Sequence, residues 1–360
     1  EQLLYCVMVQ SANEACYILA ETVSGSVDAF VQEMNDEAKA LGCESRQLFF
    51  TSCGTEGDNW AIQAACWQNR HVGRHIVTTA VEHHAVLNCC QQLEQEGWEV
   101  TTILPDQNGD ISAESVLAAV RPDTALVSCM LVNNELGTVL PVAETARAIR
   151  AARCPALLHC DAVQGFLKVP CDPAGWGVDL MSLSAHKIGG PKGIGALYVR
   201  PDLRNLRPLL AGGGQEEGLR SGTEATAQIA GFAKAVALRQ EGLEEKLAHR
   251  IKAYGRERLL SIPGVVPVGS GEAPHILAVS LVGYPSANVI NDLGSQGICL
   301  SAGSACHRGK ASRGYAALGL DKRTAAGVLR LSFGPETTQG DIDALYEALL
   351  RHKNTRFSML

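Results

Sequence analysis

Long apolar runs, clusters of basic residues and paired metal-binding cysteines are all absent from this sequence, and each absence excludes a class of protein. No apolar stretch approaches the roughly 20 residues that a membrane-spanning helix needs. The formal net charge is −7 and the basic residues are scattered, so neither nucleic acid nor a membrane is expected as a partner. No Cys-x-x-Cys pair supports a metal site. No Gly-x-Gly-x-x-Gly follows an early strand, which disfavours a nicotinamide-binding Rossmann protein.

The cysteines are numerous, but they do not indicate a disulfide scaffold. There are 13 of them, an odd number, in a chain of 360 residues, and no secretory signal is recognisable in Glu1–Gln10. We therefore expect a cytoplasmic protein in which most cysteines are small buried apolar side chains. The hydrophobic fraction of 46% and the charged fraction of 19% fit a globular chain with one large core and a second, smaller lobe.

Short apolar runs alternate with helical stretches from about Ser45 to Arg200, which is typical of an α/β fold. Strands are expected at Gln47–Phe50, His75–Thr79, Glu99–Leu104, Ala125–Leu131, Ala156–Cys160, Leu180–Leu183 and Ala196–Val199. Helices are expected between them at Asp58–Gln68, Ala85–Glu96, Ser112–Val120 and Pro141–Arg153. This order predicts a mainly parallel seven-stranded sheet covered on both faces, with ligands bound beyond the carboxyl ends of its strands.

The pattern changes after Gly212–Gly214 and predicts a smaller α+β C-terminal domain. Its elements would be a long helix from Thr226 to about Leu260, a strand at Ile276–Leu281, and helices at Ala287–Gln296 and Asp341–His352. The predicted organisation is thus an N-terminal segment (residues 1–44), mostly helical, a large domain (residues 45–225) and a small domain (residues 226–360).

The segment Asp179–Gly195 carries the strongest chemical signal. A strand leads into Ser184–Lys187, and a glycine-rich loop follows. A lysine at the carboxyl end of a strand, beside small and hydroxyl side chains, is suited to form a Schiff base with an aldehyde cofactor. Burial would lower the pKa of its ammonium group and make the free amine available. Alone, a lysine in such a loop is more often an ordinary surface residue.

Two further features would complete a site around such a cofactor. Asp161 ends the apolar strand Ala156–Cys160, where a carboxylate can pair with the protonated nitrogen of a pyridine ring and strengthen the ring as an electron sink. Gly54 and Thr55 precede a helix, whose backbone amides and dipole could hold a phosphate dianion. In isolation, the aspartate is typical of a turn and the Gly-Thr pair of an ordinary helix N-cap.

Eight stretches of the chain, in the same order, resemble the cysteine desulfurases, within the class V aminotransferase group of pyridoxal 5'-phosphate (PLP) enzymes. The matching stretches are Thr51–Asn59, Val81–Ala85, Val132–Gly137, His159–Gln164, Ser184–Gly195, Arg220–Thr223, Ser301–Cys306 and Arg330–Gly334. Each is weak alone, but together they are specific and cover the chain from about Gln47 to its C-terminus. The resemblance implies fold type I of the PLP-dependent transferases.

The resemblance also implies which side chains hold the cofactor ring. Lys187 would bind PLP covalently and move protons at the α-carbon of the substrate. His83 would stack on the pyridine ring and assist proton transfer. Asp161 would hold the ring nitrogen, while Gln164 and Asn134 would address the phenolic oxygen and nearby substrate atoms.

Two anionic groups would be bound by other residues of the same stretches. The resemblance implies that the phosphate is held by Gly54, Thr55, Ser184 and His186, and by Thr223 from the partner subunit of a homodimer. Arg330 would bind the substrate carboxylate, because its planar guanidinium matches a planar anion.

Cys306 decides which reaction is expected. It lies in the segment Gly303–Gly314, whose glycines and serines predict a mobile loop. A thiolate is the reactive form of cysteine, and His307, Arg308 and Lys310 would favour it electrostatically. For the other twelve cysteines, a buried structural role is the preferred interpretation.

The implied function is PLP-dependent cysteine desulfuration. L-Cysteine would be converted to L-alanine, and its sulfur would pass to Cys306 as a persulfide and then to an acceptor protein, an iron–sulfur scaffold or a carrier, for iron–sulfur cluster or thio-cofactor synthesis. One alternative is another class V enzyme, a selenocysteine lyase or an aminotransferase, for which Cys306 would be dispensable. Another is a non-catalytic scaffold homologue.

The first 44 residues depart from the resemblance. Family members usually begin with a strand reading Tyr-Leu-Asp-Asn-Ala-Ala-Thr-Thr and later carry Gly-Asn-Pro-Ser-Ser, and neither occurs here. Tyr5–Val9 and a mostly helical stretch from Asn13 to Leu41 stand in their place. In relatives the missing segment lines the substrate pocket and the dimer interface, whereas the cofactor site lies outside it.

Overall fold

The computed structural model of the chain describes residues 26, 47–203, 205–238, 243, 246–302, 313–356 and 358. The predicted helical segment within residues 1–44, apart from Ser26, and the predicted Cys306 loop lie outside the described residues. The boundaries predicted at residues 44/45 and 225/226 stay predictions.

A seven-stranded sheet forms the larger part of the molecule, and every strand expected for it is present. Its strands are β1 (Leu48–Thr51), β2 (His75–Thr79), β3 (Glu99–Ile103), β4 (Thr124–Ser128), β5 (Leu157–Asp161), β6 (Leu180–Ser184) and β7 (Gly195–Val199). They lie in the order β1-β7-β6-β5-β4-β2-β3. Strand β7 runs antiparallel to both of its neighbours, and the other pairs are parallel. The predicted α/β fold with a mainly parallel sheet is therefore confirmed.

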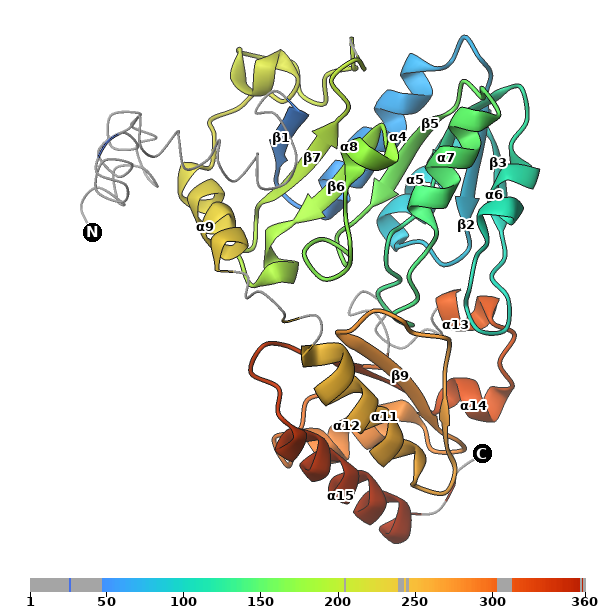
Figure 1. Cartoon of the computed structure of the whole chain (residues 1–360), viewed down its shortest axis with the longest axis vertical. Helices are drawn as coiled ribbons and strands as arrows, with labels where there is room; N and C mark the ends of the chain where they lie inside the picture. The colour runs from blue at the N-terminus through green and yellow to red at the C-terminus, as the bar shows by residue number, and fades with distance from the viewer. Residues whose placement is uncertain are drawn as a thin grey trace.

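Helices cover both faces of this sheet, since alternate residues along each strand point to opposite sides. The helices are α4 (Gly54–Gln68), α5 (His84–Gln95), α6 (Ala113–Ala119), α7 (Val142–Ala151), α8 (Pro173–Trp176) and α9 (Thr226–Ala237). Ile76 and Leu126 belong to a core cluster with residues of α4 and α5. Their neighbours Val77 and Val127 belong to the cluster that includes residues of α6 and α7 (Figure 1).

A second, three-stranded sheet lies beyond the strand ends of the first, at the bottom of Figure 1. Its strands β8 (Val265–Pro267), β9 (Ile276–Leu281) and β10 (Val328–Ser332) are antiparallel, in the order β10-β9-β8. The surrounding elements are a π-helical segment η4 (Lys246–Lys252) and the helices α11 (Ala253–Leu260), α12 (Ser286–Gly294), α13 (Arg313–Ala317), α14 (Lys322–Ala326) and α15 (Gln339–Thr355). An apolar core of their own joins β9 and β10 to α11, α12 and α15.

Helix α4 begins four residues before the expected start at Asp58. The Gly54-Thr55 pair was expected to precede the helix, but Gly54 is its first residue, and the helix packs against the segment after β5. A Cβ atom at Gly54 would lie only 2.6 Å from Cγ2 of Val163. Glycine is therefore needed for close packing at this position rather than for a turn.

Strand β4 ends at Ser128 instead of the expected Leu131, because the chain turns there toward the loop that carries Asn134. The backbone amide of Leu131 still donates to the carbonyl oxygen of Asp161, at 2.9 Å. Among the described residues, no helix combines the length and the hydropathy needed to cross a bilayer.

We predict that Leu126→Ala destabilises the protein and that Leu104→Ala does not. Leu126 is 0% exposed in β4, whereas Leu104 is 70% exposed. The buried truncation leaves a cavity and should lower the free energy of unfolding by about 2–5 kcal/mol, against about 0.5 kcal/mol or less at the exposed position. Denaturant unfolding of both variants is the measurement, and equal losses would contradict the assigned core.

Candidate functional site

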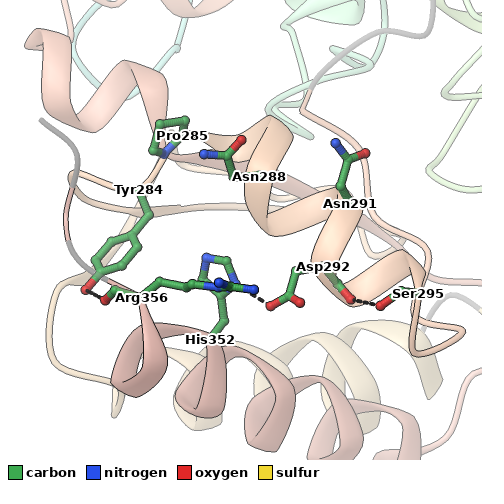
Figure 2. Close-up of a pocket in the computed structure, with 8 residues that line it drawn as sticks. All are labelled: Tyr284, Pro285, Asn288, Asn291, Asp292, Ser295, His352 and Arg356. Atoms are coloured by element: carbon green, nitrogen blue, oxygen red, sulfur yellow. Dashed lines mark hydrogen bonds and ion pairs between the residues drawn. The ribbon is translucent and has the colours of Figure 1, made fainter.

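Two hollows among the described residues bear on function, and the larger one contains neither an amine nor a thiol. It has a volume of about 690 Å³ and lies between α12 and the C-terminal part of α15 (Figure 2). Its lining residues are Tyr284, Pro285, Asn288, Asn291, Asp292, Ser295, His352 and Arg356. The carboxylate of Asp292 is already paired with His352, at 2.6 Å. The lining offers neither an amine nor a thiol as a nucleophile, so this hollow is a poor candidate for catalysis.

The second hollow, of about 330 Å³, lies at the carboxyl ends of the central parallel strands, and we call it the site pocket. It is lined by Cys53, Gly54, Thr55, Asp58, His83, Met130, Asn134, Asp161, Val163, Gln164, Ser184, His186, Lys187 and Arg330. Ten of the twelve residues singled out from the sequence are in this set. The structure therefore brings together residues that lie far apart in the chain.

The N-terminus of α4 forms one wall of the site pocket. Gly54 and Thr55 are its first two residues, and the N-cap residue Cys53 makes no side-chain hydrogen bond to the helix. The amides of a first helical turn have no partners within the helix, and the helix dipole adds positive potential there. This wall is suited to an anion such as a phosphate group.

Asp161 lies at the floor of the site pocket, at the end of the central strand β5. Its side chain is nearly inaccessible, at 4% exposure, and its Oδ1 accepts a hydrogen bond from the amide of Val163 at 2.9 Å. Burial raises the pKa of Asp161, while His83, the Val163 amide and Lys187 oppose that rise. A cationic group placed against this carboxylate would relieve the cost of its burial.

A second carboxyl group, on Asp58, lies beside Asp161 and was missed by the sequence analysis. Asp58 is 1% exposed, and ligand atoms of Asp58, Asp161 and His83 lie within 4.8 Å of one another. Burial and the neighbouring charge of Asp161 raise the pKa of Asp58 well above its ordinary value. Of the two carboxyl groups, Asp58 is therefore the one whose protonated form is more strongly favoured. Asp58 lies one helical turn after Gly54 and so on the same side of α4. This spacing is the sequence signal that could have identified Asp58 as a site residue.

Lys187 enters the site pocket from the 3₁₀ turn η2 (Ala185–Ile188), which follows β6 directly. The hydroxyl group of Ser184, at the end of β6, bonds to Nδ1 of His186 at 2.8 Å. The expectation that Lys187 is buried is wrong for the described part of the chain, where both His186 and Lys187 are exposed. Whether the amine is covered depends on which segment of the chain packs over it, and the strand and loop around Lys187 do not determine that.

His83 is held by the start of α5, of which it is the N-cap residue. Its Nδ1 accepts the backbone N–H of Ala85 at 3.2 Å, so the other ring nitrogen is left for the site pocket. The preceding residue, Glu82, is 4% exposed and accepts hydrogen bonds from the amide of Met130 and the hydroxyl of Thr79. Glu82 thus fixes the loop that presents His83.

Asn133 fixes the loop that carries Asn134, as Glu82 fixes the loop that carries His83. Its amide nitrogen donates to the carbonyl oxygen of Val81 at 2.7 Å, and its oxygen accepts the backbone amides of Glu135 and Leu136. Glu82 and Asn133 both lie inside the stretches that carried the resemblance. Only His83 and Asn134 were predicted from the sequence as site residues within these two stretches.

Arg330 reaches the site pocket from β10 of the small sheet. Its Nη1 donates to the backbone oxygen of Asn134 at 2.8 Å, and its buried Nε has no hydrogen-bond partner among the described residues. A buried donor without a partner is costly, which a bound anion would correct. Asn134 and Arg330 therefore form a wall with free capacity for a carboxylate.

The two remaining predicted residues are not in the site pocket. Thr223 is exposed and does not line it, and Cys306 lies outside the described residues. Ser301, five residues before Cys306 (306 − 301), pairs through its backbone with Arg330. None of the nine described cysteines forms a disulfide, and five of them are buried.

We predict that Glu82→Gln flattens the pH dependence of stability. Burial raises the pKa of Glu82 to about 8 from 4.5, so the folded state holds the proton more tightly than the unfolded state. The stabilisation by the protonated carboxyl is complete below pH 4.5 and is lost as the pH rises to 8, by up to about 1.4 kcal/mol per pH unit. Denaturant unfolding of the cofactor-free protein at pH 5, about 6.5 and about 7.5 is the measurement.

The free energy of unfolding of Glu82→Gln should increase relative to that of the parent protein as the pH increases. The exposed Glu94→Gln, on α5, is the matched control and should follow the parent at every pH. A stability difference between Glu82→Gln and the parent that does not change with pH would contradict the buried, protonated state of Glu82.

Comparison with known proteins agrees with this geometry. Residues 22–345 match the family described as aminotransferase class-V. The chain is 40% identical over 321 residues to cysteine desulfurase IscS of Clostridium botulinum, which covers 87% of this chain and 80% of that protein. Among solved structures, a NifS-like protein has a TM-score of 0.83 at 33% identity and covers 90% of this chain and 88% of that one. SspA in complex with cysteine has a TM-score of 0.73 at 33% identity, covering 85% and 87%.

Proposed function

The chain belongs to the aminotransferase class-V family, and from that membership we propose that it is a PLP-dependent cysteine desulfurase. It takes sulfur from L-cysteine, releases L-alanine and leaves the sulfur on Cys306 as a persulfide. One observation carries the proposal: an amine (Lys187), a buried carboxylate (Asp161) and an uncapped helix N-terminus line the same pocket.

The residues of the site pocket fit PLP as a cofactor. A volume of about 330 Å³ lies within the range of about 300–1,000 Å³ that is common for small-molecule sites. The three groups also match the three ends of PLP, namely an aldehyde, a protonated pyridine nitrogen and a phosphate. A metal ion could use Asp58, His83 and Asp161, but it would leave the amine and the N-terminus of α4 without a role. PLP is therefore the better occupant.

When bound, PLP supplies an electron sink for the negative charge that develops on the α-carbon of the substrate. Asp161 would pair with the protonated ring nitrogen, and the raised pKa of Asp58 disfavours a second negative charge at that point. Lys187 holds the cofactor covalently and moves the proton at the substrate α-carbon. His83 would stack on the ring, and its second ring nitrogen would be available for proton transfer.

Arg330 and Asn134 orient the substrate. The guanidinium of Arg330 has donors left after its bond to the Asn134 carbonyl, and they bind the α-carboxylate of L-cysteine. The complex of SspA with cysteine supports this substrate, because that structure resembles the chain over 85% of its length. An anion here also satisfies the buried Nε of Arg330.

The sulfur transfer uses the thiolate of Cys306. It attacks the sulfur of the substrate, so that an S–S bond forms and the C–S bond of the substrate breaks. The electron pair of that bond stays on carbon, which takes up a proton and becomes the methyl group of alanine. Five residues of chain span at most about 18 Å, which keeps Cys306 within reach of the Ser301–Arg330 pair.

A homodimer and an acceptor protein complete the proposed function. Thr223 is exposed and away from the site pocket of its own chain, which fits a phosphate ligand donated to the partner subunit. Arg220, three residues earlier, is anchored to Glu56 of α4 at 2.6 Å. An iron–sulfur scaffold or a carrier then accepts the persulfide sulfur. The reaction requires a reduced thiol, which fits the cytoplasm.

We predict that Lys187→Ala abolishes the yellow colour of the PLP-loaded protein. Without the amine, no covalent link forms and the proton at the α-carbon is not moved, so turnover should fall by about a thousandfold or more. The measurements are visible absorbance after dialysis and alanine formation. Lys192→Ala, an exposed lysine in the same glycine-rich loop, is the control and should keep both. A coloured, active Lys187→Ala variant would remove the basis of the proposal.

We predict that Cys306→Ala keeps the colour but no longer forms sulfide from cysteine. The cofactor is bound by other residues, whereas the persulfide acceptor is lost. Sulfide and alanine are measured with a thiol reductant present, and Cys299→Ala, an exposed cysteine, is the control that retains parental rates. Parental rates in Cys306→Ala would instead indicate a different class V activity, for which selenocysteine and amino-group transfer are the assays.

A further inference from the structure

The side chain of Gln164 contacts two residues outside the site pocket, and the proposed mechanism gives neither of them a role. Its Oε1 accepts a hydrogen bond from Nζ of Lys168 at 3.1 Å and lies 3.3 Å from Nε2 of His275. Gln164 lines the site pocket, whereas Lys168 and His275 do not. Both are nearly inaccessible, with 8% and 6% exposure.

The chemistry of these contacts determines which way the amide faces. An ammonium group donates hydrogen bonds and cannot accept them, so the atom of Gln164 that faces Lys168 is the oxygen. The same oxygen faces Nε2 of His275, which therefore carries a proton and donates as well. With its oxygen directed at two donors, the amide presents its NH₂ group to the site pocket.

Local structure and tertiary packing both contribute to this arrangement. Gln164 and Lys168 lie four residues apart, in the turn after β5 in which the amide of Phe166 bonds to the carbonyl of Ala162 at 2.8 Å. This turn brings the two side chains together. His275 directly precedes β9, so it comes from the small sheet. The orientation of Gln164 thus depends on contacts with both sheets.

We propose that Lys168 and His275 are positioning residues, which hold the NH₂ group of Gln164 toward an anionic oxygen of the ligand. This inference rests on the proposed function, in which that oxygen is the phenolic oxygen of PLP. A donor at this position stabilises the negative charge on the oxygen, whereas the reversed amide would place a carbonyl oxygen against it. Neither Lys168 nor His275 needs to touch the cofactor.

The test is a pH titration of the visible absorbance of the PLP-loaded protein. In the PLP-loaded protein, the phenolic oxygen and Nζ of Lys187 would share a proton. A hydrogen bond donated to the phenolic oxygen would stabilise its negative charge and so weaken the binding of that proton. Gln164→Leu removes the donor and should raise the apparent pKa of the chromophore by about 1 unit. Lys168→Met releases the amide on one side and should raise it by about 0.5 unit.

A double-mutant cycle separates positioning from a general structural effect. If Lys168 acts through Gln164, Lys168→Met shifts the apparent pKa in the parent but not in the Gln164→Leu background. Lys252→Met is the matched control, because Lys252 is another buried lysine, bound to the carbonyl oxygens of Gly271 and Ala273, and it should leave the pKa unchanged. Should Lys168→Met fail to fold, His275→Phe enters the same cycle, with the same expected result.

The outcomes distinguish this inference from the proposed function. A parent protein that acquires no visible band with added PLP overturns the proposed function and this inference with it. A band whose apparent pKa is the same in the parent and in Lys168→Met overturns this inference alone. An equal shift in the parent and in Gln164→Leu also overturns it, because Lys168 would then act independently of Gln164.

Discussion

The burial of one carboxylate, Asp161, is the constraint on which the arrangement of the site pocket depends. It ends β5, the middle strand of the seven-stranded sheet. Its side chain accepts one hydrogen bond from a backbone amide, so its charge needs further partners. Because its neighbours are parallel, the loops that carry His83 and Lys187 emerge at the same edge and supply those partners. Burial and the charge of Asp161 raise the pKa of Asp58, on α4, which disfavours a second negative charge there. The parallel arrangement of the central strands thus determines which side chains surround Asp161.

The parts of the fold that the sequence predicted are those with a local cause. Strands β2 (His75–Thr79) and β9 (Ile276–Leu281) have the bounds that their apolar and β-branched runs indicated. The start of α4 was predicted too late, because a Gly-Thr pair is typical of a helix N-cap and the contact of Gly54 with Val163 joins residues that are distant in the chain. Ten site residues could be named because the motifs that carry them are contiguous in sequence.

The supporting polar residues could not be predicted, because their partners are distant in the chain. Glu82 bonds to Met130, 48 residues away, and Asn133 to Val81, 52 residues away, and neither pairing leaves a trace in local composition. The exposure of Lys187 was unpredictable for a related reason. Whether a lysine after a strand is covered depends on which segment packs over it, and nothing within residues 179–195 specifies that segment.

The bond between Arg330 and Asn134 joins the two sheets at the point where an anion binds. A guanidinium from β10 and a loop after β4 can grip one carboxylate together only while the two sheets keep their mutual placement. Anion affinity and the seating of the small sheet are therefore thermodynamically linked. A protein that binds to α12 or α15 and shifts the small sheet must therefore change the affinity for the anion. By reciprocity, the bound anion must change the affinity for that protein.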